Sequence, residues 1–342
     1  MPETKAELDS LRTGLISHKI LELFVKELAE SKLSGNVYSH EKSKERIKEL
    51  LDFHFEEITH SSSKNDSISK RFTYLYNRLF VILSALAVHL CDDISQSEFV
   101  PADFEVNIGL SDDTIESVPI DLVGDDGEKR GELRIVGQVD RADVYRKDDK
   151  TYVRIIDYKT GPKSFKKDDV AYGFNLQMLL YLYCIALSKT KKYGENVVPA
   201  GVLYIPVRKP EVKDAVLGDD IAEKGESALK GAFKGDGVLI DDLDVLNAMD
   251  KGITGRFVPA VLASTGGFNK MRSKVESLEK MGELLDRAAQ VSGKLACLMY
   301  DGNIQTNPYK KVMSSCEHCD YKSVCRIDRK NENIRYTWEE VL

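Results

Sequence analysis

Residues 154–161 (Arg-Ile-Ile-Asp-Tyr-Lys-Thr-Gly) place a carboxylate and an amine two positions apart. Aliphatic and β-branched residues before them predict a strand, and the Thr-Gly-Pro sequence that follows predicts its end. Because alternate residues of a strand share a face, Asp157 and Lys159 are expected to point the same way. Such a pair can hold a cation and a water molecule together. A surface salt bridge on an edge strand is the alternative interpretation of the pair taken by itself.

A second carboxylate lies on the strand expected just before this one. Asp140 belongs to residues 137–143 (Gly-Gln-Val-Asp-Arg-Ala-Asp), and a hairpin at 146–150 would bring that strand beside Asp157. Carboxylate oxygens are the ligands that Mg²⁺ prefers in proteins. The two segments together therefore predict a candidate site for a divalent cation.

The elements that would position these residues form an α/β pattern. Apolar residues at helical spacing predict helices over 11–33 and 42–59 and a third that ends near residue 94. His18 lies on the apolar stripe of the first helix, which suits a core residue or a ligand. Gln177 and Tyr181, four apart on a later helix, are expected to project from one face. The remaining predicted elements are strands at 104–108, 131–146, 151–159 and 199–207 and helices at 172–189, 241–249 and 271–299.

Three cysteines near the C-terminus have the spacing of a metal-binding cluster. Cys316, Cys319 and Cys325 form C-x2-C-x5-C, and a C-x2-C turn lets both thiolates reach one soft metal ion. The spacing matches neither ferredoxin pattern, so a zinc site completed by His318 or Cys297 is the alternative. Elsewhere, Cys184 is expected to be an inert core thiol, whereas Cys91 suits either role.

Composition describes an ordinary globular chain. Of 342 residues, 42% are hydrophobic and 31% charged, which suits one large domain or two smaller ones. The apolar run at 79–91 is shorter than the roughly 18–20 residues that span a bilayer, and the N-terminus lacks a signal-peptide core, so a cytoplasmic location is expected. The net charge of −7 argues mildly against nucleic-acid binding unless acids hold metal ions and positive charge is local.

Six motifs in this order resemble the RecB-type nucleases of the PD-(D/E)xK superfamily, in particular the C-terminal nuclease domain of AddB-type proteins of bacterial AddAB helicase–nucleases. They are Gly-Leu-Ile-Ser-His at 14–18, the segments containing Asp140 and Asp157, Tyr-Gly-Phe-Asn-Leu-Gln-Met-Leu-Leu-Tyr at 172–181, Pro-Ala-Gly-Val-Leu-Tyr at 199–204, and the cysteine cluster. The resemblance implies a restriction-endonuclease-like α-β-β-β-α-β core with added N-terminal helices and a C-terminal helix plus cysteine knot. We expect one nuclease domain, with N-terminal helices at 1–97, the α/β core at 98–208, and an insertion, long helix and cysteine cluster at 209–342.

The resemblance also implies roles for individual residues. Mg²⁺ or Mn²⁺ would be bound by four groups, which are His18, Asp140, Asp157 and the Tyr158 carbonyl. The catalytic residues would be Asp140, Asp157 and Lys159. Five residues would contact DNA, namely Gln177, Tyr181, Lys163, Lys166 and Lys167, although the three lysines also suit a solvated loop.

In this family the three C-terminal cysteines join one upstream cysteine to hold a [4Fe–4S] cluster. No cysteine occurs among the seventeen residues before His18. We therefore expect a fragment of a longer protein whose cluster lacks its fourth ligand in this chain. Substitution by Cys91 or Cys297, or loss of the cluster, are the alternatives.

The function implied is a metal-dependent DNA exonuclease domain that acts on single strands unwound by an AddA-type helicase partner in double-strand-break repair and recombination. For AddB-like domains the resemblance implies degradation of the 5′-ended strand. One alternative is a catalytically silent nuclease fold that binds DNA or supports assembly, and another is a zinc-stapled structural domain. The presence of Asp140, Asp157 and Lys159 favours the enzyme.

Overall fold

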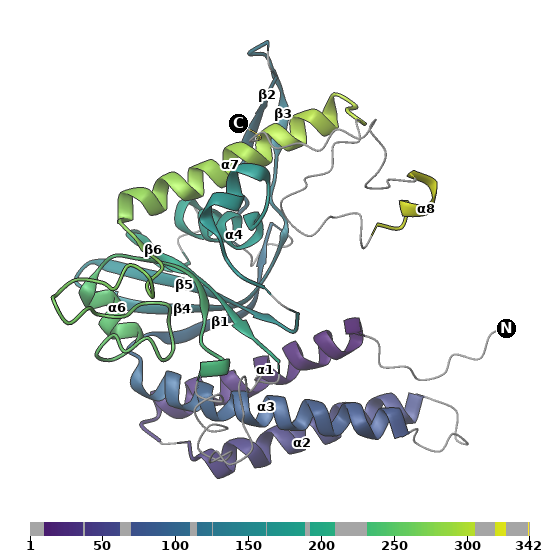
Figure 1. Cartoon of the computed structure of the whole chain (residues 1–342), viewed down its shortest axis with the longest axis vertical. Helices are drawn as coiled ribbons and strands as arrows, with labels where there is room; N and C mark the ends of the chain where they lie inside the picture. The colour runs from purple at the N-terminus through teal and green to yellow at the C-terminus, as the bar shows by residue number, and fades with distance from the viewer. Residues whose placement is uncertain are drawn as a thin grey trace.

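Three long helices open the chain and lie together on one side of the molecule (Figure 1). The computed structural model describes residues 10–36, 38–61, 70–109, 115–124, 126–161, 163–188, 192–208, 231–304, 319–325 and 341. The helices are α1 (Ser10–Leu33), α2 (His40–Ser61) and α3 (Lys70–Gln96), as the apolar periodicity predicts. Their shared interior is apolar, because Leu21, Phe24, Leu51 and Leu83 are all fully buried. This bundle is the layer that carries His18.

Next to the bundle lies a six-stranded mixed sheet with strand order β1-β4-β5-β6-β7-β8. The strands are β1 (Val100–Ile108), β4 (Gly137–Lys147), β5 (Lys150–Lys159), β6 (Val197–Pro206), β7 (Asp236–Ile240) and β8 (Val275–Glu276). β1, β4 and β5 pair antiparallel in succession, whereas β5 and β6 pair in parallel through a helical crossover, as predicted. Helices α4 (Leu176–Leu187) and α7 (Leu278–Tyr300) cover the face opposite the N-terminal helices (Figure 1). The sheet is thus enclosed between two helical layers.

The predicted long strand at 131–146 is wrong, because the chain forms two strands there. Residues 129–133 form β3 (Lys129–Leu133), which pairs with β2 (Ile120–Val123) in a separate hairpin, and β4 begins only at Gly137. This hairpin packs beside α7, where a Cβ on Gly293 would lie 3.1 Å from Ile120 Cγ2. The period-two pattern runs through both strands, so the break is set by tertiary packing and not by a local signal.

The predicted helix at 172–189 begins later than expected. A 3₁₀ turn, η1 (Lys167–Tyr172), comes first, and Gly173 and Asn175 then adopt left-handed backbone angles (φ 83° and 58°) before α4. A left-handed residue ends a right-handed helix.

The predicted helix at 271–299 also begins later, because Ser277 caps α7 by accepting a hydrogen bond from the Lys280 amide at 3.2 Å. The short helix expected at 241–249 is α6 (Leu243–Met249), and α8 (Lys322–Cys325) lies near the C-terminus. β7 and β8, on either side of α6 in the sequence, are absent from the predicted elements.

By length and composition alone, one helix among the described residues could cross a membrane: Phe72–Gln96, within α3. Half of its most apolar window is buried inside the fold. Leu86 and Leu90 have no exposed surface, and α3 packs on both α1 and α2. A core helix of a globular protein passes the same test, and the packing of α3 fits that description.

His89 of α3 gives the fold a defined pH dependence. Its ring is buried, 5.9 Å from Phe233 and 5.1 Å from Phe257 between centroids, and burial followed by repulsion from Arg256 lowers its pKa from 6.5 to about 4. The unfolded chain therefore binds a proton that the folded chain resists. Stability is full above the unfolded pKa and falls as the pH drops toward 4, by about 2 kcal/mol between roughly pH 7.5 and 5.

Urea unfolding at the two pH values measures this loss. A His89→Gln variant, which has no proton to bind, should show a loss smaller by about that 2 kcal/mol. An identical pH dependence in the variant would contradict the assignment to His89.

Candidate active site

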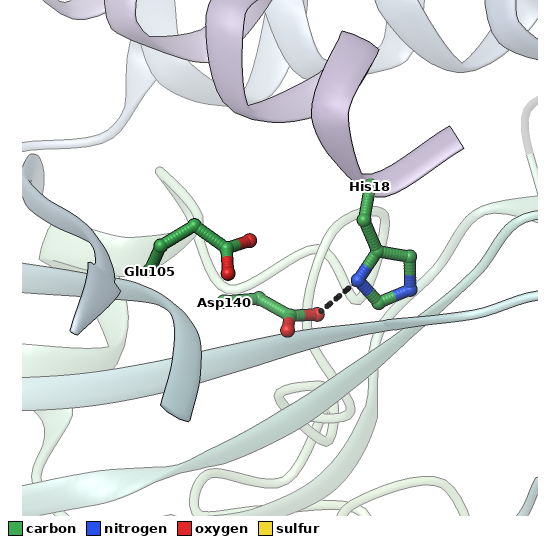
Figure 2. A group of neighbouring side chains, drawn as sticks. All are labelled: His18, Glu105 and Asp140. Atoms are coloured by element: carbon green, nitrogen blue, oxygen red, sulfur yellow. Dashed lines mark ion pairs between the residues drawn. The ribbon is translucent and has the colours of Figure 1, made fainter. Parts of the chain in front are cut away.

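Three side chains from three elements meet above the sheet (Figure 2). His18 extends from α1, Glu105 from β1 and Asp140 from β4, and one ligand atom of each lies within 4.8 Å of the others. His18 Nδ1 is 3.2 Å from Asp140 Oδ2. The same helix turn approaches β5, since a Cβ on Gly14 would lie 3.9 Å from Thr160 Oγ1. Segments far apart in sequence are thus brought to one end of β4 and β5.

The end of the β4–β5 ladder fixes the position of Asp140. The last paired residues of the two strands are Arg141 and Ile156. Beyond them Asp140 Oδ2 accepts a hydrogen bond from the Tyr158 amide at 2.8 Å. A side chain therefore takes the place of the next ladder contact, and the carboxylate is held to the segment that carries Asp157 and Lys159.

Asp157 and Lys159 share a face of β5, as the alternation predicts. Lys159 Nζ lies 2.8 Å from Asp157 Oδ1 and 2.7 Å from Oδ2. Burial raises the pKa of Asp157, repulsion from Asp140 adds to the rise, and Lys159 opposes it. Asp157 is only 5% exposed, and its Oδ2 has no hydrogen-bond partner of good geometry among the described atoms. A buried carboxylate oxygen in that state is suited to a further cationic partner.

Glu105 is a site residue that the sequence reasoning missed. It stands between Phe104 and Val106, which pair with Arg141 and Val139, so its backbone lies opposite Asp140. Its φ of 49° is left-handed, a conformation that costs a non-glycine residue on the order of 1 kcal/mol. Burial and then the nearby Asp140 raise its pKa. A lone acid in an otherwise apolar strand was the available signal, and it is a weak one.

The donor set fits a divalent cation such as Mg²⁺ or Mn²⁺. It offers carboxylate oxygens and one imidazole, which suit these ions better than soft metals. The hydrogen bond to Asp140 raises the pKa of His18 despite burial, and Asp157 and the Tyr158 backbone also raise it. Of the predicted ligands, His18 and Asp140 lie in contact, Asp157 is paired with Lys159, and Glu105 joins the group.

A family model described as the PD-(D/E)XK nuclease superfamily matches residues 1–326. The chain belongs to this superfamily. Asp157-Tyr158-Lys159 stands as its (D/E)-x-K element and Asp140 as the preceding acid, here after Val139 in place of proline. The fold is accordingly that of a PD-(D/E)XK nuclease.

Curated relatives of this nuclease superfamily member are named as one of the subunits of an ATP-dependent helicase/deoxyribonuclease. The protein from Clostridium botulinum (strain Hall) is 32% identical over 327 residues, 94% of this chain and 27% of the relative. Those from Thermoanaerobacter sp. (strain X514) and Ruminiclostridium cellulolyticum are 31% and 30% identical, covering 94% and 93% of this chain and 27% of each relative. The chain spans about a quarter of the length of the curated relatives it matches.

Two further residues predicted for this nuclease site lie on α4. Gln177 Nε2 is 3.4 Å from the Tyr181 hydroxyl, so both project from one face. The Tyr181 hydroxyl covers the first residue of β4, because a Cβ on Gly137 would lie 2.1 Å from it. Glycine at 137 therefore lets α4 approach the strand that carries Asp140.

A Gly137→Ala substitution should displace Tyr181 and lower stability by about 1–3 kcal/mol, the usual cost of overpacking a core. Nuclease activity should fall as well, since α4 and β4 would separate beside the site. Urea unfolding and DNA degradation measure the two effects. Gly131→Ala is the matched control, because nothing lies within 4 Å of a Cβ there. Equal behaviour of the two variants would contradict the packing role.

The three predicted DNA-contacting lysines occupy different places. Lys163 Nζ lies 5.5 Å from the centroid of the Tyr204 ring, beside Lys159 Nζ at 5.8 Å from the same ring. Lys166 and Lys167 line a different hollow, and Lys167 pairs with Glu276. Lys163 is thus the one that lies at the nuclease site.

The predicted iron–sulfur cysteines fall largely outside the described residues. Cys316 and the side chain of Cys325 are not described, and Cys319 is exposed with a free thiol. Cys184 is a buried core thiol, as predicted. Cys91 is buried with its Sγ donating to the Tyr38 carbonyl at 2.8 Å, and Cys297 is buried too. The cluster therefore stays a prediction.

Proposed function

We propose that this chain is a metal-dependent deoxyribonuclease domain that hydrolyses phosphodiester bonds of DNA. The observation that carries the proposal is the Lys159–Asp157 pair beside the group of His18, Glu105 and Asp140 in a member of the PD-(D/E)XK nuclease superfamily. A carboxylate-bound cation next to a lysine is suited to phosphate chemistry, because both neutralise charge on the phosphate.

Each residue of the site has a role that follows from its contacts. Mg²⁺ or Mn²⁺, held by His18, Glu105, Asp140 and Asp157, would neutralise charge on the scissile phosphate and activate water as a nucleophile. Lys159, aligned by Asp157 at 2.7–2.8 Å, would orient the attacking water and stabilise the added negative charge of the transition state. Asp140 keeps its orientation through the Tyr158 amide.

The finer proposal is an exonuclease acting on single strands. The relatives carry helicase and deoxyribonuclease in one name, which supports a helicase partner of the AddA type, double-strand-break repair and recombination as the process, and the 5′-ended strand as the substrate. Gln177 and Tyr181 would contact DNA phosphates near the site. A [4Fe–4S] cluster at Cys316, Cys319 and Cys325, with zinc as the alternative, and a cytoplasmic location complete the proposal.

Degradation of end-labelled single-stranded DNA tests this function. With Mg²⁺ the chain should release short products from one end, a chelator should stop the reaction, and added Mg²⁺ should restore it. Circular single strands, which have no end, should survive. Cleavage that persists in chelator, or DNA that is bound yet stays intact with both Mg²⁺ and Mn²⁺, would overturn the proposal, and the second outcome would identify a silent DNA-binding fold.

A further inference from the structure

A cleft of about 440 Å³ adjoins the catalytic lysine and is lined mainly by cations. It begins at Lys159 and is bordered by the ends of β5 and β6 and by segments on either side of α6. One carboxylate, Asp236, faces six cationic side chains there, giving a formal charge of +5. The six are Lys159, Lys163, Arg208, Lys234, Arg272 and Lys274.

Most of this charge is available to a ligand. Lys274 is engaged, since it pairs with Asp236 and donates to the Phe165 carbonyl at 3.0 Å. Lys163, Lys234 and Arg272 form no ion pair with a carboxylate among the described residues. Burial and then neighbouring cations lower the pKa of both lysines, Lys159 acting on Lys163 and Arg272 on Lys234. Cations held close without counterions favour a polyanion.

The surroundings of the cleft favour a sugar–phosphate backbone over bases. The aromatic residue in its wall, Tyr204, is 2% exposed and lies under Lys159 and Lys163, so it offers no open face for stacking. The chain as a whole carries a net charge of −7. A polyanion is therefore repelled by the chain as a whole and attracted where the cleft meets Lys159.

We propose that this cleft holds the phosphates of a DNA strand next to the scissile phosphate, without regard to base sequence. The inference rests on the proposed function and names the path by which its substrate enters or leaves the site. Lys234 and Arg272 are the deciding residues, because they lie outside the nuclease motifs and make no other described ionic contact.

Binding without cleavage tests the cleft separately from catalysis. The probe is a short fluorescent single-stranded DNA, followed by anisotropy in chelator for the wild type and the Lys234→Gln/Arg272→Gln variant. The variant should bind at least about tenfold more weakly, and the slope of log K against log salt should shrink by about 1.4, that is about 0.7 for each lost phosphate contact. The control, Lys44→Gln/Lys280→Gln, removes the same charge from exposed lysines outside the cleft and should bind as the wild type does.

Two further arms define the ligand. An oligonucleotide with a neutral methylphosphonate backbone should not bind in the cleft, and two different base sequences should bind alike. Wild-type affinity in the cleft variant, or an equal loss in the control variant, would overturn the inference. If DNA is cleaved but the cleft variant binds normally, the cleft fails and the function stands. If binding depends on the cleft but no metal supports cleavage, the function fails and the cleft stands.

Discussion

Replacing Asp157 with alanine is expected to reduce DNA cleavage by at least about 10³-fold, with a Lys159→Ala variant losing about 10²–10³-fold. Asp157 is a buried carboxylate with one oxygen lacking a hydrogen bond, and it aligns the Lys159 ammonium at 2.8 Å. Its removal would take away a cation ligand and the partner that positions Lys159. Because both residues act on one transition state, the double variant should be little worse than Asp157→Ala alone.

Single-turnover degradation of labelled single-stranded DNA with saturating Mg²⁺ measures these losses. Lys147→Ala/Asp244→Ala is the matched control, because it removes an acid–lysine pair that is exposed and distant from the site residues in sequence. An exposed pair contributes about 0–1 kcal/mol to stability, so the control should keep wild-type activity. Equal activity in all variants would reject the proposed site, and near-additive losses would mean that Asp157 and Lys159 act independently.

The elements that a local pattern specifies were predictable from sequence. The three N-terminal helices and β5 carry long apolar periodicities, and the parallel pairing of β5 with β6 follows from the helix between them. β8 has two residues and β7 has five, too few for periodicity to detect. Their place in the sheet depends on partners distant in sequence, and so does the break between β3 and β4.

The same division holds for the site. Asp157 and Lys159 share a motif, and the resemblance supplied His18 and Asp140. Glu105 was missed because its role depends on a strand register and a left-handed backbone angle that no local pattern reports. Lys234 and Arg272 reach the site from segments in which the sequence offered no functional signal. Local alternation therefore predicted the catalytic pair, whereas the remaining groups needed the tertiary fold.

Behind the catalytic strand lies a network of charges with almost no exposure to solvent. Arg141 donates to Asp143 through Nε and Nη2, both at 2.6 Å, and through Nη1 to the Tyr158 hydroxyl at 3.0 Å. Arg154 Nε adds a bond to Asp143 Oδ2 at 3.0 Å. Burial opposes ionisation of Asp143, yet Arg141 and Arg154 hold its pKa below the usual range. One carboxylate thus balances two buried guanidinium groups.

An Asp143→Ala substitution should lower the free energy of unfolding by about 3–5 kcal/mol, because it leaves both guanidinium groups buried without this partner. Urea unfolding measures the loss, and Asp244→Ala, at an exposed aspartate, should cost under about 1 kcal/mol. A loss at Asp143 no larger than that of the control would contradict the role of the network in stability. Tyr158 joins Asp157 to Lys159 in the chain, so its hydroxyl also ties the network to the catalytic strand. Tyr158→Phe removes only that tie, and a fall in cleavage larger than its fall in stability would show that Arg141 positions the catalytic pair as well as stabilising the fold.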